Sequence, residues 1–174
     1  MNLPLEMREL KKLLSGLDKQ LGIHSMLNLV LSSGMSTDDV LNIRLENLKY
    51  ESNTILIYDK YLGRTRTVPL PARVMKLINE YQNGHDNPKI KLYEVSEPII
   101  NNRLSNLAQD RLKHPISWSG IRHTWAQMAF KRDVSLRSMQ ETSGASLEQL
   151  AKWSLYKKPE TDIDSTADLL KEFY

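Results

Sequence analysis

A short β-rich region lies between segments whose apolar residues have helical spacing. This region is the feature that most restricts the fold of the 174-residue chain. Residues 54–58 read Thr-Ile-Leu-Ile-Tyr, and residues 65–68 alternate with a period of two. Runs rich in β-branched and aromatic residues are typical of strands, and Gly63 between these two runs supplies a turn. Pro69 and Pro71 close the hairpin. We therefore predict a mainly α protein (α+β) with one small antiparallel sheet.

Apolar residues spaced by three and four predict helices on both sides of the hairpin. Ser36 before Asp39 forms a variant of the capping box, and Ser146 with Gln149 forms another. Gly144 suits a helix C-cap. The expected helices cover residues 5–17, 23–34, 37–43, 73–81, 97–112, 119–131, 135–144, 146–157 and 165–173.

The composition excludes several classes of site. There is no cysteine, which excludes disulfides, thiol catalysis and thiolate zinc sites. The four histidines show no metal-ligand spacing, and no glycine-rich segment matches a phosphate-binding loop. No apolar run approaches the roughly 20 residues of a membrane span. We expect a cytoplasmic protein that needs no metal, nucleotide or other cofactor and no membrane.

Charge is distributed unevenly along the chain, whose net charge is +3. Nine basic and three acidic residues lie between positions 111 and 158, and five acids with one lysine follow in 160–174. We expect residues 1–158 to form one domain and residues 159–174 an acidic tail with a short helix. A basic stretch before an acidic tail fits a phosphate-binding face, although a solvated helix surface also explains the charges.

Three segments carry a more specific pattern. They are residues 33–44 together with the hairpin over 56–70, residues 116–126, and residues 134–146. The most specific parts are the Ile121-Arg122-His123-Thr124 box and the Val68-Pro69-Leu70 ending of the hairpin. In this order and spacing the segments resemble the catalytic domain of the tyrosine recombinases, the phage integrase family. The resemblance covers about residues 3–156 and implies the fold of that domain.

The resemblance also implies a site for double-stranded DNA. Members of this family cut and rejoin DNA through a tyrosine that attacks a backbone phosphate and forms a 3′-phosphotyrosine. Two arginines brace the phosphate oxygens, where bidentate guanidinium geometry suits the charge of the transition state. A hairpin lysine and two histidine-type residues move protons, and neither a metal nor a nucleotide takes part.

Two of the six implied active-site positions match this sequence. Lys60 stands at the hairpin lysine and Arg122 at the second arginine, and His123 follows Arg122 as in the family. The four departures are Ser36 at the first arginine, Ser119 at the histidine that opens the box, Ala145 at the later histidine or tryptophan, and Ser154 at the tyrosine. The nearest tyrosine, Tyr156, lies two positions late, and two positions turn a helical side chain by about 200°.

These departures predict a domain that binds DNA without cutting it. Losing one charge-stabilising donor costs roughly 2.7–4 kcal/mol, and losing a general acid or base slows a reaction a further ~10²–10⁴-fold. We expect a recombinase-derived repressor or accessory protein of a phage or mobile element. Its expected contacts with duplex DNA are Lys60, Arg64, Arg66, Arg122, His123, Lys157 and Lys158.

Two other functions stay open at this point. An active integrase or resolvase would use Tyr156, Arg122 and Lys60, whereas a protein–protein module would have kept the fold and lost DNA. We also expect the helix over 165–173 to pack on a second copy of the chain, as C-terminal segments of the family often do.

Several of these residues also have an ordinary structural explanation. Ser36 suits a helix N-cap, Lys60 suits an edge strand, and Arg66 suits a brace for the hairpin. A buried carboxylate would serve Arg122 as well as a phosphate would, and His123 suits a structural histidine.

Overall fold

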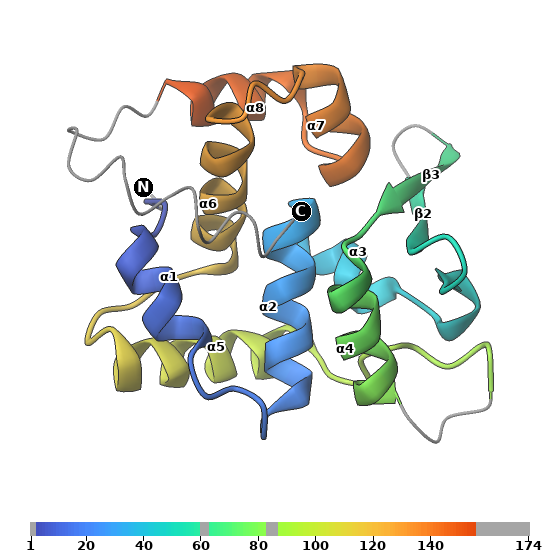
Figure 1. The fold of residues 1–174 in the computed structure, drawn as a ribbon, viewed down its shortest axis with the longest axis horizontal. Coiled ribbons are helices and arrows are strands. Elements are labelled where there is room, and N and C mark those ends of the chain that lie inside the picture. Colours follow the sequence, from blue (N-terminus) through green and yellow to red (C-terminus); the bar gives the residue numbers. More distant parts are fainter. Residues whose placement is uncertain (1–2, 60–62, 83–86, 156–174) are drawn as a thin grey trace.

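The computed structural model of the chain describes residues 3–59, 63–82 and 87–155. Over these ranges the chain is mainly helical with one three-stranded antiparallel sheet, which confirms the expected fold class. In chain order the elements are α1 (Met7–Leu14), α2 (Leu21–Ser33), α3 (Thr37–Asn42), the 3-10 turn η1 (Leu45–Asn47), β1 (Leu48–Lys49), β2 (Thr54–Asp59), β3 (Arg64–Pro69), α4 (Ala72–Gln82), α5 (Glu97–Arg111), α6 (Trp118–Phe130), α7 (Leu136–Ser143) and α8 (Leu147–Ser154) (Figure 1).

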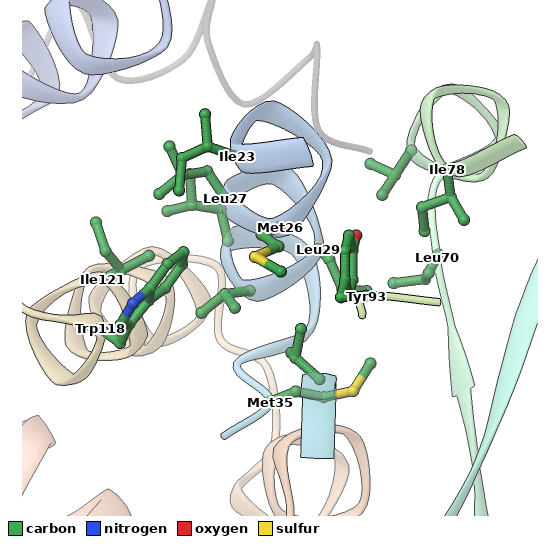
Figure 2. Close-up of a cluster of buried hydrophobic side chains, with 14 of the residues drawn as sticks. Ile23, Met26, Leu27, Leu29, Met35, Leu70, Ile78, Tyr93, Trp118 and Ile121 are labelled. Atoms are coloured by element: carbon green, nitrogen blue, oxygen red, sulfur yellow. The ribbon is translucent and has the colours of Figure 1, made fainter. Parts of the chain in front are cut away.

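Helix α2 forms the centre of the main core. Every side chain from Ser25 to Ser33 is buried, because α2 packs against α4, α5 and α6. A helix that carries apolar residues around most of its circumference is stable in water only when neighbours cover it in this way. Figure 2 shows α2 between Trp118 and Ile121 of α6 on one side and Ile78 of α4 on the other.

The sheet has the order β1-β2-β3 and stands at one edge of the molecule (Figure 1). Ile55 lies opposite Val68 and Ile57 opposite Arg66, as the predicted hairpin requires, and Gly63 after β2 has φ +61°. Strand β1 was not predicted. It has two residues, Leu48–Lys49, which are too few to show a period of two.

The predicted helix caps are present. The Ser36 hydroxyl accepts the Asp39 N–H at 3.1 Å, and the Asp39 carboxylate accepts the Ser36 N–H at 3.4 Å. Gly144 ends α7 with φ +67°, and the Ser146 hydroxyl accepts the Gln149 N–H at 3.1 Å. Because these pairs lie within three residues of each other, local sequence is enough to predict them.

A second, smaller apolar cluster joins α6, α7 and α8. Its buried members are Trp125, Ala126, Ala129, Met139, Ala145, Leu150 and Trp153. The cluster holds α7 and α8 over the end of α6, above the main core in Figure 1. Residues of α6 therefore contact residues of α8 that lie about thirty positions later in the sequence.

The expected helix over 165–173, the domain boundary at 158/159 and the contact with a second copy lie outside the described residues. Within the described ranges, no helix is long and apolar enough to cross a membrane. The same ranges contain no cluster of three or more metal-ligating side chains.

Candidate functional site

A groove of about 810 Å³ opens between α3, strand β2 and the ends of α6, α7 and α8. Ser36 and Asp39 line it from the start of α3, and Arg122 lines it from α6. Gly144 and Gln149 line it where α7 gives way to α8. The fold thus brings three of the positions singled out from the sequence, Ser36, Arg66 and Arg122, to one site.

Arg122 is half-buried and held from two sides. Its Nε donates to the Gly34 carbonyl at 2.8 Å, at the C-terminal end of α2. Its guanidinium carbon lies 5.3 Å from the centre of the Trp153 ring. The two terminal nitrogens of Arg122 make no hydrogen bond with any residue that the structure describes. They are the donors that the groove offers to an anion.

Burial lowers the pKa of Arg122 below its usual value, while the charge of Asp39 raises it and that of Arg66 lowers it. A guanidinium group nevertheless stays protonated in proteins. Arg122 therefore keeps its positive charge in the groove.

Arg66 is almost fully buried and serves the fold. Its Nη2 donates to the Asp39 carboxylate at 2.7 Å, and its Nη1 donates to the Thr142 carbonyl. Burial lowers the pKa of Arg66, and the charges of Asp39 and Asp59 raise it. Arg66 thus ties β3 to α3 and α7, so its position favours the structural brace over the expected contact with DNA.

The four residues that depart from the family pattern occupy structural positions in the fold. Ser36 caps α3, and Ala145 is buried in the second apolar cluster with only 2% of its surface exposed. Ser119 lies in the first turn of α6, half-buried and three residues before Arg122. The Ser154 hydroxyl donates to the Ala151 carbonyl at 2.7 Å.

Helix α8 ends at Ser154 with Leu155 as its C-cap, earlier than the expected end near residue 157. The rotation of about 200° assigned to Tyr156 assumed a continuous helix. Leu155 keeps the αR conformation (φ −73°, ψ −12°) and Tyr156 lies outside the described residues, so the orientation of Tyr156 stays a prediction.

His123 is buried, with 4% of its surface exposed. Its ring stacks on Trp153 with 5.9 Å between ring centres, and Nε2 lies 3.4 Å from the Trp153 carbonyl oxygen. This position suits a structural histidine and does not favour the expected contact with DNA.

The remaining predicted contacts lie on or near the hairpin and the C-terminal segment. Arg64 is exposed at the start of β3, directly after Gly63. Lys60, Lys157 and Lys158 lie outside the described residues.

Sequence reasoning missed the acidic residues of the groove. Its lining holds three arginines and four acids, and the acids are Asp38, Asp39, Glu46 and Asp59. A count of charges along the chain does not reveal the ratio of acids to arginines in the groove. The four acids are separated in the sequence and come together only in the folded structure. Trp153 was not singled out as a site residue either. Nothing in its local sequence indicates a contact with Arg122.

A three-stranded sheet beside a helical core, with an arginine of α6 lining a groove, agrees with the fold of a tyrosine-recombinase catalytic domain, and solved recombinase structures superpose on it. The chain belongs to the Phage integrase family, whose sequence profile matches residues 4–153. The family named from the sequence is thereby confirmed.

Individual relatives are distant. The chain is 21% identical to tyrosine recombinase XerA of Saccharolobus solfataricus over 119 residues, which are 68% of this chain and 40% of that protein. A crystal structure of XerA recombinase superposes with a TM-score of 0.75 at 16% identity, covering 99% of this chain and 65% of that one. XerH recombinase bound to its difH substrate before cleavage gives 0.74 at 20% identity, covering 89% and 51%. The chain therefore spans less than two thirds of the length of these relatives.

Proposed function

We propose that this chain binds duplex DNA without cutting it, as a repressor or accessory protein of a phage or mobile element. The observation that carries the proposal is the position of Arg122, which lines the groove and whose two terminal nitrogens have no hydrogen-bond partner among the described residues. Such a fork matches two oxygens of one phosphate. Backbone phosphates supply most of the affinity of a protein for DNA.

Relatives with this fold have been solved with DNA, which supports DNA as the ligand. XerH recombinase was solved bound to difH. The integrase of the transposon Tn1549 was solved with transposon right end DNA, and it superposes with a TM-score of 0.71 at 13% identity. The proposed contacts of this chain are Arg122 and the exposed Arg64, together with Lys60, Lys157 and Lys158.

The absence of cleavage is inferred from the four departures in the family pattern. Ser36 brings a hydroxyl that caps a helix in place of a guanidinium group. Ala145 brings a buried methyl group in place of a proton carrier. A missing charge-stabilising donor costs roughly 2.7–4 kcal/mol, and each missing acid or base slows the reaction by ~10²–10⁴-fold. Together these losses leave the phosphate bound but unreactive.

The match of residues 4–153 to the Phage integrase family favours a second candidate function, an active recombinase that uses Tyr156, Arg122 and Lys60. Arg122 lines the groove, whereas Tyr156 and Lys60 lie outside the described residues. This candidate shares the DNA contacts of the first and differs in forming a covalent bond.

The proposal is tested by measuring affinity for a short mixed-sequence duplex over a range of salt concentrations. Affinity should fall as salt rises, because each neutralised phosphate releases counterions. Arg122→Gln should weaken binding and reduce the slope of log affinity against log salt by about 0.9, the value for one phosphate.

Lys11→Gln is the matched control, since Lys11 is exposed on α1, across α2 from the hairpin (Figure 1). It removes the same charge and should leave the slope unchanged. A slope near zero for the unaltered chain would contradict DNA binding, and equal effects of the two variants would contradict binding in the groove.

A further inference from the structure

Three side chains of α6 converge on one residue of α8. Arg122 covers the Trp153 ring at 5.3 Å, and the His123 ring stacks on the same indole. Gln127 Nε2 donates to the Trp153 carbonyl, which also lies 3.4 Å from His123 Nε2. Trp153 is thus fixed through both its ring and its backbone.

The buried indole in turn restricts Arg122. Trp153 has only 7% of its surface exposed and belongs to the second apolar cluster. The Gly34 carbonyl accepts a hydrogen bond from Nε of Arg122 at 2.8 Å. The indole ring restricts the movement of the guanidinium group from a second direction. Attraction between a guanidinium group and an indole face adds to this restraint. Arg122 lines the groove, and its two terminal nitrogens have no hydrogen-bond partner among the described residues.

We infer that Trp153 is a positioning residue that, with the Gly34 carbonyl, preorganises Arg122 as a fork for one phosphate. This inference rests on the proposed function, because it concerns how the same groove holds DNA. Preorganisation raises affinity since the side chain does not lose its freedom at the moment of binding. Ala145 and Trp153 both belong to the second apolar cluster, so the small residue at 145 and the large residue at 153 are features of this chain's own sequence.

The first test compares the salt-dependent binding of a short mixed-sequence duplex by variants at position 153. Trp153→Leu should weaken binding about fivefold and lower the salt slope, because a released guanidinium group neutralises the phosphate less completely. Trp153→Phe keeps an aromatic face and should bind within about twofold of the unaltered chain. Leu150→Ala is the matched control. It disturbs the same cluster from the same helix and should leave the slope unchanged.

The second test separates positioning from a general structural effect. In the Arg122→Gln background, Trp153→Leu should cause no further loss of affinity, because residues that act through one contact are not additive. Losses that simply add would overturn the inference, as would an unchanged salt slope in Trp153→Leu.

A measurement on the unaltered chain covers the case in which Trp153→Leu does not fold. The Arg122 Nε–H should give a separate NMR cross-peak, displaced by the Trp153 ring and slow to exchange with water. A cross-peak averaged with those of exposed arginines would overturn the inference. If the unaltered chain binds no duplex, the proposed function fails, while the NMR result still decides whether Trp153 positions Arg122.

Discussion

At the residue scale, Asp39 distinguishes the role of the buried Arg66 from that of the half-buried Arg122. Its carboxylate caps α3 and also pairs with Arg66 at 2.7 Å. Arg66 is consequently committed to the fold, whereas Arg122 bonds a backbone carbonyl through Nε and keeps two donors for the groove. On the proposed function, the affinity of the groove for phosphate should therefore depend on Arg122 more than on the number of arginines that line it.

A second residue-scale contact makes stability depend on pH. His114 Nε2 lies 2.8 Å from the Glu9 carboxylate, and this hydrogen bond raises the pKa of His114 above its usual 6.5. Because the folded-state pKa exceeds the unfolded one, the stabilisation is complete below about pH 6.5 and is lost as pH rises through the folded-state pKa. His114→Asn should therefore be less stable than the unaltered chain at about pH 5.5 and equally stable near pH 8.5. Urea unfolding at both pH values measures this.

His24→Asn is a control with the opposite sign. Burial lowers the pKa of His24, so its contribution to stability is present above about pH 6.5 and declines as pH falls through the folded-state pKa. The stability of His24→Asn relative to the unaltered chain should therefore improve toward acid. A difference between His114→Asn and the unaltered chain that does not change with pH would contradict the role of the Glu9 contact.

At the scale of elements, Gly34 fixes the turn between α2 and α3. Its φ of +67° favours glycine, and a Cβ placed there would lie 2.3 Å from the Trp125 ring. Gly34→Ala should lower the free energy of unfolding by about 3 kcal/mol, the sum of backbone strain and overpacking. Gly16→Ala is the control. Gly16 has φ +63° but no atom within 4 Å of a Cβ, so it should lose only about 1 kcal/mol. Equal losses in urea unfolding would contradict the contact with Trp125.

Local signals predicted most elements but not all of their ends. The hairpin and the caps at Ser36, Gly144 and Ser146 depend on neighbours in the sequence, and the structure confirms them. Strand β1 was missed because two residues carry no periodicity. The end of α8 at Ser154 was also missed, since the apolar spacing that predicts a helix does not mark where it stops.

At the scale of the whole molecule, the site depends on contacts between distant parts of the chain. The sequence predicted that Arg122 would belong to the site, because a family motif marks it. It did not predict the pairing of Arg66 with Asp39, the acids of the groove or the support from Trp153. These contacts join residues that are far apart in the sequence, so no local pattern specifies them.

The central claim is that the chain holds DNA without forming a covalent bond to it. The most direct measurement incubates the protein with fragments of the genome that encodes it. Bound DNA is then counted under native conditions and again after boiling in detergent. We predict complexes in the native sample and none after detergent. Complexes that survive detergent in the unaltered chain but not in Tyr156→Phe would contradict the claim and establish a phosphotyrosine bond.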